Sequence, residues 1–597
     1  MCHLLGIGTT VKSCSAASSK MSVEELKEVA AELKHLDDRL SEVKQKRLLT
    51  LTEAQLPLPK RNRMIQSKLE TVTKNDMLDM EYARLCVMSM CRSTFMDSSW
   101  TSNFFSSNFN YEVPSRRKVM RDLIPLLYKN CMKQVKEICG FNKGRTFCTL
   151  STDGWQSPDG QHLRNYMIVL NEISFLHSTT CSGTKSMNAE AISEEIIEVI
   201  DDIGPDYVAS LVTDNASSET TAWDYVMNKH EDVLCSGCCV HGGNLLFKDV
   251  TTDHKWSKDI VESANALATF IRSHTWTLAR VKEESGLTVT YHCMTRFAGA
   301  YYTMHRLMKL KDPIRAIFSS SEYSRKNYER GPQMYTLVMR NQFWENMDAL
   351  LAYLQPLKNF IRLMDATRHM TEHVIPVLND IETEWSSNKD VPPRFVQHTC
   401  KLLRKRAEWI SFDCHRAAYA LSPEYHGDDV SSNVHITRSL KKIVEFYCHN
   451  RRATVIDVMT EFSEYKERPM EPENFPSRGA SAKNLDSPTS LSWWSLYGAE
   501  WPLLQEIAIR VFSMGSSSST SERNWSTFGN IWNRRSSGYT VESASMICAI
   551  KYNTQAIFNW RLKKKLAAAK RVASAHDEAH QQSTDSESCS DESESED

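Results

Sequence analysis

The sequence lacks the features that would assign a chain of 597 residues to a membrane or secreted class. No apolar run approaches the roughly 18 residues that a membrane-spanning helix requires, and the first residues form neither a secretory signal nor a transit sequence. The 17 cysteines follow no repeating framework, which is typical of a reducing compartment. We therefore expect a soluble intracellular protein with no membrane partner.

The sequence also has almost no net charge. The formal value is −2, so the overall balance neither supports nor excludes nucleic acid as a partner. Residues 585–597 carry seven acids and no base, which leaves the rest of the chain mildly basic. Any affinity for DNA must then come from local patches. One basic run, residues 563–571, is a nuclear import signal, a phosphate-contacting helix face or a solvated helix end.

The length and the hydrophobic pattern predict several domains. A chain of this length exceeds a single hydrophobic core, so two to four domains are expected. Short apolar stretches at residues 147–150, 166–172 and 208–212 predict strands. Helical periodicity predicts helices over residues 189–203 and 217–229. Long helices then follow almost without interruption, and there is no internal repeat.

Three acidic residues lie far apart in the sequence, each in a setting that suits a shared metal site. Asp153 follows the first predicted strand, Asp214 follows the third, and Glu522 opens a predicted helix. Any one of them alone is most simply a turn or capping residue. Together they are the carboxylates that a two-metal phosphoryl-transfer site needs, and hard divalent ions such as Mg²⁺ prefer oxygen ligands.

A cysteine–histidine segment and a group of tryptophans are also distinctive. Cys235, Cys238 and His241 have the spacing of half a zinc site, but no second ligand pair lies close by, so we do not expect structural zinc. A buried structural pair is the simpler interpretation of Cys238 and His241. The tryptophan cluster indicates either a buried core or an apolar subunit interface. It includes Trp493, Trp494 and Trp501.

The segments around the three acids resemble motifs of the hAT superfamily of transposases. Ser-Thr-Asp-Gly-Trp at residues 151–155 is similar to the family's first catalytic Asp motif, and Val-Thr-Asp-Asn-Ala at 212–216 to its second. Ser-Glu-Arg-Asn-Trp-Ser at 521–526 is similar to the C-terminal signature that carries the last acid. The resemblance implies that the three acids are catalytic and hold two Mg²⁺ or Mn²⁺ ions. It also implies an α/β plus all-α fold, in which an RNase H-like mixed sheet is split by a large all-helical insertion and preceded by an N-terminal helical region.

The same resemblance implies contacts with transposon-end DNA. The family carries a Cys-x-x-His motif at the active-site edge, a Thr-Arg-aromatic segment early in the insertion, and an Arg after the catalytic Glu. The matching residues here are Cys238, His241, Arg296, Phe297 and Arg523. Many members have Trp at the position of Phe297, where it stacks on a base flipped out during hairpin formation. A phenyl ring offers less stacking area than indole, and a core residue of the insertion is the alternative.

The residue patterns and the resemblance together predict eight segments. They are a partial BED-type zinc finger (1–20), a short amphipathic or coiled-coil helix (21–50), a helical DNA-binding or dimerisation region (51–140), the first part of the RNase H-like domain (141–252), the helical insertion (253–465), a linker (466–490), the last part of the RNase H-like domain with a hAT dimerisation region (491–570), and a disordered acidic tail (571–597). Trp493, Trp494 and Trp501 look like the opening of the dimerisation region.

We therefore expect a nuclear hAT-like DNA transposase, or a domesticated derivative, that acts as a homodimer or larger homo-oligomer. Its partners would be transposon ends and target DNA, with no small-molecule substrate. The implied reaction is metal-dependent cleavage of one strand, hairpin formation on the flanking DNA, and transfer of the element's ends to a target. The alternative is a catalytically inactive transposase-derived DNA-binding and dimerisation factor, such as a gene regulator. A different RNase H-like nuclease is a third possibility.

Overall fold

The computed structural model describes most of the chain between residues 75 and 588. The described ranges are 75–91, 93–141, 146–157, 160–183, 187–289, 298–427, 433–449, 453–469, 476–477, 480, 489–532 and 539–588, with side chains as far as residue 566. The chain divides into two units, residues 1–79 and 80–597, and the fold below is that of the second. The predicted zinc-finger remnant (1–20) and the predicted helix (21–50) lie outside the described residues.

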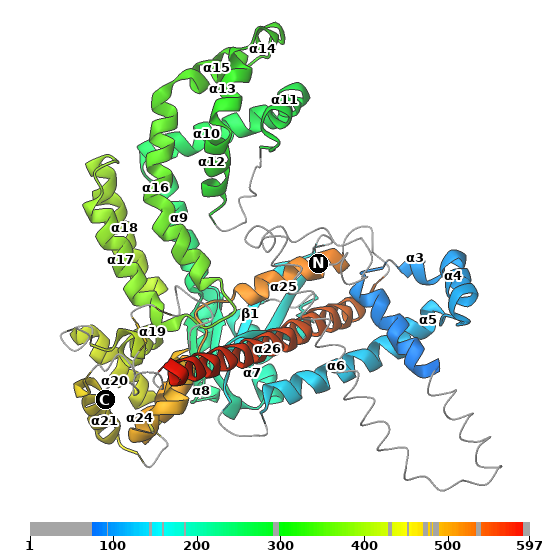
Figure 1. The fold of residues 1–597 in the computed structure, drawn as a ribbon, viewed down its shortest axis with the longest axis vertical. Helices are drawn as coiled ribbons and strands as arrows, with labels where there is room; N and C mark the ends of the chain where they lie inside the picture. The colour runs from blue at the N-terminus through cyan, green and yellow to red at the C-terminus, as the bar shows by residue number, and fades with distance from the viewer. Residues whose placement is uncertain are drawn as a thin grey trace, which may run out of the picture. The chain divides into compact units, whose positions relative to one another are not determined.

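A mixed five-stranded sheet organises the second unit (Figure 1). Its strands are β1 (Cys148–Gln156), β2 (His162–Leu170), β3 (Ile173–Cys181), β4 (Val208–Thr213) and β5 (Leu234–Gly237). The spatial order is β3-β2-β1-β4-β5. Strands β1, β2 and β3 are antiparallel neighbours, whereas β4 runs parallel to β1, and β5 parallel to β4. Because parallel strands end at the same edge of a sheet, residues that follow β1 and β4 come close together.

Three helices cover one face of the sheet. They are α6 (Ile124–Cys139), α7 (Ala189–Ile203) and α8 (Ser217–Lys229). Asn188 caps the start of α7, because its side chain accepts a hydrogen bond from the Ala191 amide. Ile192, Ile196 and Ile200 lie on one side of α7 and are buried in the same apolar core as Leu150 and Tyr166 of the sheet. Full burial of each such isoleucine contributes about 1.5–3 kcal/mol.

The opposite face is covered by two helices from the C-terminal part of the chain. They are α25 (Ser519–Ile531) and α26 (Val541–Ser588). Trp525 and Phe528 of α25 share an apolar core with Met167 of β2. Asn553 of α26 binds the edge strand β3 in the manner of a neighbouring strand. Its side-chain oxygen accepts from the Leu176 amide at 2.7 Å, and its side-chain nitrogen donates to the Leu176 carbonyl at 2.9 Å.

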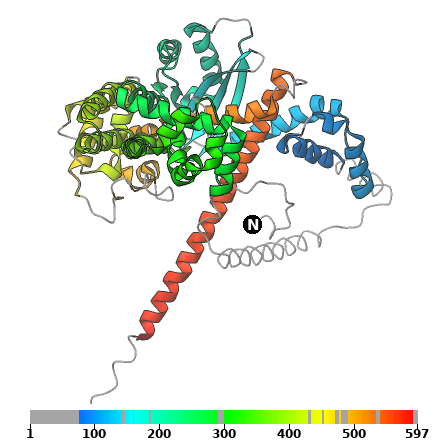
Figure 2. The ribbon, with the colours of Figure 1, turned by 90° about the horizontal axis from the view of Figure 1, so that it is seen from above.

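A large helical block separates β5 from α25 in the sequence (Figures 1 and 2). Its first apolar core includes α9 (Cys239–Thr252), α10 (Lys255–Ser273), α11 (Thr275–Ser285), α12 (Gly299–Lys309), α13 (Lys311–Ser319), α14 (Ser321–Arg325), α15 (Gly331–Met339), α16 (Asn341–Met364), α17 (Val374–Ser387) and α18 (Pro393–Ile410). A second core joins α19 (Asp413–Leu421), α20 (Val434–Cys448), α21 (Val455–Glu467), α23 (Ser490–Tyr497) and α24 (Pro502–Phe512). No helix within the described ranges is long and apolar enough to cross a membrane.

The N-terminal part of the second unit is helical, as expected. Residues 80–88 are helical, and they are followed by α3 (Ser93–Met96), α4 (Ser99–Phe109), α5 (Arg116–Lys118) and the π-helix η1 (Val119–Leu123). Several of these residues share a core with α25 and α26. Together, the predominance of helix and the small mixed sheet confirm the expected combination of α/β and all-α structure.

Several local predictions need correction. The helices over residues 189–203 and 217–229 are confirmed at both ends, but the predicted strand 147–150 is too short, since β1 continues through Asp153 to Gln156. Strand β2 begins before the predicted 166–172 and ends at Leu170, and β3 and β5 were not predicted.

The predicted disorder of the tail is wrong for residues 571–588, because α26 continues to Ser588. An alanine-rich sequence that extends an anchored helix does not need a new helical nucleus, which is the costly step in helix formation.

Candidate functional site

The three acids come from three elements that meet at one end of the sheet. Asp153 lies in the second half of β1, Asp214 directly follows β4, and Glu522 lies in the first turn of α25. Because β1 and β4 are adjacent and parallel, they bring the two aspartates together. Each of the three carboxylates is partly buried.

The carboxylates are close enough to change one another's proton affinity. Burial, followed by the negative charge of Asp214, raises the pKa of Asp153 to about 7. Burial, followed by the charges of Asp153 and Asp365, raises the pKa of Glu522 to about 8. Asp214 also contributes to the shift of Glu522. The end of the sheet is therefore a partly desolvated region of crowded negative charge.

Small polar residues of β1 hold the segment that precedes Glu522. The Thr149 hydroxyl donates to the Ser513 carbonyl at 3.0 Å and accepts from the Gly515 amide at 2.7 Å. Ser151 lies two positions further along β1, on the same face, and its hydroxyl is 2.9 Å from the Ser521 hydroxyl. These contacts join residues more than 360 positions apart in sequence, and they place α25 across the strand that carries Asp153.

Strand β2 and two stacked indole rings also hold α25. Asn165, which lies opposite Asp153 in the β1–β2 register, donates to the Ser521 carbonyl at 2.9 Å. Trp155 and Trp525 stack with ring centroids 5.4 Å apart and planes inclined by 20°. Each of these residues lies within three positions of a candidate acid or directly across from one, so the packing fixes the acids as well.

The helical block contacts α25 from another direction. Arg523 donates to the Asp365 carbonyl and carboxylate at 2.6 and 2.9 Å, and to the Thr367 hydroxyl at 3.1 Å. The Cys238 thiol, at the start of α9, accepts from the backbone amides of His241 and Ser518. Arg523 and Cys238 therefore anchor α25 in this chain.

A buried ion pair lies immediately beside the acids. Arg164 of β2, opposite Gly154 in the sheet, donates to Glu219 of α8 at 2.6 Å. The two side chains are only 7% and 8% exposed. The positive charge of Arg164 opposes the rise in the pKa of Asp153, and burial, with a further contribution from Asp214, raises the pKa of Glu219. Sequence analysis did not identify this pair, because the partners are 55 residues apart and neither belongs to a recognisable motif.

The donor set at this site suits a hard divalent cation. Three carboxylates whose charges repel one another in a partly buried position are stabilised by a cation, and Mg²⁺ and Mn²⁺ prefer carboxylate oxygens. Within the described ranges, however, no three His, Cys, Asp or Glu side chains are grouped so that they could hold a metal ion as they stand. The carboxylates are therefore neighbours without forming a preassembled three-ligand site.

Two predicted DNA contacts, Arg296 and Phe297, lie outside the described residues. The next described residue, Ala298, donates its backbone amide to the side chain of Asn244 on α9 at 3.1 Å. His241 lies on the first turn of α9 and is partly buried. The predicted roles of these residues in binding DNA remain predictions.

The predicted dimerisation tryptophans are interior residues of this chain. Trp493, Trp494 and Trp501 are 6%, 0% and 5% exposed and belong to the second core of the helical block. The Trp494 indole donates to the Leu421 carbonyl at 2.8 Å. On the surface of α23, Leu496 is 74% exposed. The buried tryptophans thus determine the shape of this region, and exposed apolar residues such as Leu496 are available to a partner chain.

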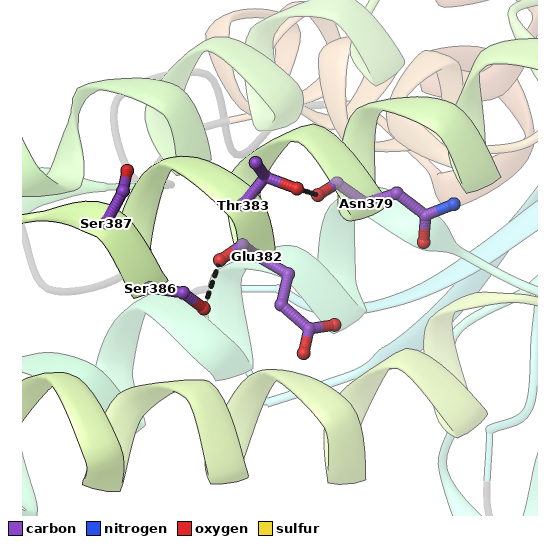
Figure 3. Close-up of a pocket in the computed structure, with 5 residues that line it drawn as sticks. All are labelled: Asn379, Glu382, Thr383, Ser386 and Ser387. Atoms are coloured by element: carbon purple, nitrogen blue, oxygen red, sulfur yellow. Dashed lines mark hydrogen bonds between the residues drawn. The ribbon is translucent and has the colours of Figure 1, made fainter.

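A polar pocket lies on the helical block, far in sequence from the three acids. Its lining residues do not form an arrangement typical of a catalytic site. It is lined by residues of α17 between Asn379 and Ser387 (Figure 3). The hydroxyls of Thr383 and Ser386 donate to carbonyls of their own helix, and Glu382 pairs with Arg404 at 2.6 Å. The pocket is therefore a shallow surface feature of a single helix, and the chemistry is to be sought at the end of the sheet.

Comparison with protein families gives two matches. A model described as a domain of unknown function (DUF659) matches residues 114–267, which include the strands, Asp153 and Asp214. A model described as the hAT family C-terminal dimerisation region matches residues 470–554, which include Glu522. No curated protein matches the sequence. The second match supports a homodimer or larger homo-oligomer.

Proposed function

This chain is a hAT-family transposase-like protein, and on that premise we propose that it cuts and joins DNA by metal-dependent phosphoryl transfer. The proposed centre is an RNase H-like domain formed by the mixed sheet and the helices that flank it. The proposed substrates are the ends of a transposable element and a target DNA, which place the activity in the nucleus.

The observation that carries the proposal is that three carboxylates from distant segments lie at one end of the sheet and that the pKa values of two of them are raised. Asp153, Asp214 and Glu522 come from β1, the end of β4 and α25. The charge of Asp214 contributes to the raised pKa of Asp153, and the charges of Asp153 and Asp214 contribute to the raised pKa of Glu522. A fold has no structural need to gather three acids in a partly desolvated position, because the repulsion destabilises it. Functional sites are where such arrangements are found.

In the proposed mechanism, Asp153, Asp214 and Glu522 would hold the metal ions. Bound Mg²⁺ or Mn²⁺ would activate the attacking oxygen and stabilise the leaving oxygen of the phosphodiester. Asp153 and Glu522 must release their protons to act as ligands, and their raised pKa values make that step pH-dependent. The contacts of Ser521 with β1 and of Arg523 with the helical block hold the first turn of α25, which carries Glu522.

Cleavage of DNA that carries the element's own terminal repeats tests the proposal. The full-length chain with Mn²⁺ is expected to nick the repeat end, and Asp153→Asn, Asp214→Asn and Glu522→Gln are each expected to reduce the rate by at least about 100-fold. Asp224→Asn, an exposed carboxylate on α8, is the matched control and should retain full activity. If the wild type does not cut, or cuts as fast as the three variants, the proposed enzyme is excluded.

The second candidate is a transposase-derived protein that binds DNA and dimerises without cutting. It is favoured by the absence, among the described side chains, of a group that could hold a metal ion as it stands. This candidate predicts specific DNA binding that is unchanged by EDTA and by Asp153→Asn. The enzyme predicts that binding of Mn²⁺ itself is lost in that variant.

A further inference from the structure

The Arg164–Glu219 pair is more buried than stability alone explains. Both side chains are more than nine-tenths buried, and a buried ion pair stabilises a fold only when its remaining hydrogen bonds are satisfied. Within the described part of the chain, Nε and Nη1 of Arg164 and Oε2 of Glu219 have no hydrogen-bond partner. The pair therefore lacks some of the hydrogen bonds that its charges need. Apolar residues at these two positions would cost less desolvation free energy.

The position of the pair links it to the candidate acids through both of its elements. Arg164 is adjacent in β2 to Asn165, the residue directly across from Asp153 in the sheet. Glu219 lies in the first turn of α8, five residues after Asp214. The guanidinium therefore lies at the same end of the sheet as the acids, and Glu219 determines where it lies.

We propose that Arg164 is a positioning residue of this site: held by Glu219, its guanidinium acts as a fixed internal cation that sets how tightly the three carboxylates bind a divalent metal ion. This inference rests on the proposed function. Arg164 touches no reacting atom and acts only through its charge, since the interaction between charges inside a protein extends over several ångströms. Glu219 neutralises most of that charge, and the remainder acts on the carboxylates.

The two partners have opposite charges, so removing them one at a time should change metal binding in opposite directions. Glu219→Gln leaves a buried cation beside the acids and is expected to weaken Mn²⁺ binding roughly tenfold or more. Arg164→Gln leaves an additional buried anion and is expected to strengthen Mn²⁺ binding by a similar factor. The double variant restores the original net charge and should bind Mn²⁺ within about threefold of the wild type.

The experiment is a titration of the full-length chain with Mn²⁺, in which free Mn²⁺ is measured by electron paramagnetic resonance. Thermal unfolding in EDTA is measured for every variant, because each single substitution leaves a buried unpaired charge and lowers stability. Arg164→Lys retains the charge, and its Mn²⁺ affinity should stay near that of the wild type. Asp224→Asn on the exposed side of α8 is the control for a change in total charge.

The possible results separate this inference from the proposed function. If the wild type binds no Mn²⁺, or Asp153→Asn binds it equally well, the metal site is excluded and the inference with it. If Asp153→Asn abolishes binding but both single variants shift the affinity in the same direction, or neither shifts it, the pair has only a structural role and the inference alone is overturned. If a single variant does not fold, the sign is read from the other single variant relative to the double variant.

Discussion

Replacing Glu522 with glutamine should stabilise the metal-free protein at neutral and alkaline pH while abolishing its proposed activity. The folded state raises the pKa of this carboxyl from 4.5 to about 8, so the folded chain binds more protons than the unfolded chain between those values. Stability therefore falls as pH rises through that window. Below about pH 4.5 the group is protonated in both states and contributes no difference.

The magnitude follows from the size of the shift. A difference of 3.5 pKa units corresponds to a ceiling of about 5 kcal/mol, at about 1.4 kcal/mol per unit. Partial exposure of Glu522 screens its charge, and part of the shift is shared with Asp153, whose own pKa is raised to about 7. We expect a gain of about 1–2 kcal/mol for Glu522→Gln at pH 7.5 and almost none at pH 4.5.

Thermal unfolding in EDTA, from pH 4.5 to 8.5, measures this difference between the wild type and Glu522→Gln. Adding Mn²⁺ should stabilise the wild type more at pH 8 than at pH 6, because protons compete with the metal for the same oxygens. The same addition should leave the variant almost unchanged. If the two proteins lose stability in parallel as pH rises, the carboxylates do not repel one another in the folded state, and the argument for a shared site fails.

Three further predictions concern the residues around the site and the subunit interface. Gly237→Ala should destabilise the protein by about 1–3 kcal/mol and weaken Mn²⁺ binding. The reason is that a Cβ at this position would lie 1.6 Å from Oδ1 of Asn215, the residue after Asp214. Chemical unfolding measures the first effect and Mn²⁺ titration the second. Asn553→Leu should cost about 2–4 kcal/mol in chemical denaturation, since it removes both hydrogen bonds to the backbone of β3. Leu496→Glu should weaken self-association in sedimentation experiments without lowering stability, because this side chain is 74% exposed.

The sequence predicted elements whose signal is local. Helices over residues 189–203 and 217–229 have apolar residues at helical spacing, and the structure places both at those bounds. The sequence of the second half of β1 predicts a turn, because Asp153 and Gly154 are residue types with low strand propensity. It is a strand because each residue from Thr149 to Gln156 pairs with β2, and no window of sequence contains that information. Strand β5 is only four residues long and includes Cys, Ser and Gly, so it has no strand signal of its own.

The candidate site likewise contains residues that the sequence predicts and residues that only the folded structure identifies. The three acids were found from their motifs, whereas the groups that position them were not. Thr149 and Ser151 are small polar residues with no distinctive sequence context. Their role comes from hydrogen bonds to Ser513 and Ser521, more than 360 residues later in the chain. Arg164 and Glu219 lie 55 residues apart and belong to no motif. Residues that act through another residue carry no pattern in the sequence, because their chemistry depends on a contact made by the fold.

The contacts of α25 explain how the helical block can influence the site. Glu522 is held from the sheet by the Ser151–Ser521 contact and from the block by Arg523, which binds Asp365 just after α16. A rotation of the block relative to the sheet cannot keep both sets of contacts, so it must move either α25 or the segment after α16. Any movement of α25 would change the position of Glu522 relative to Asp153. Within the described residues the carboxylates are neighbours without being grouped as metal ligands, so the two sets of contacts that position α25 also determine where Glu522 lies relative to the aspartates.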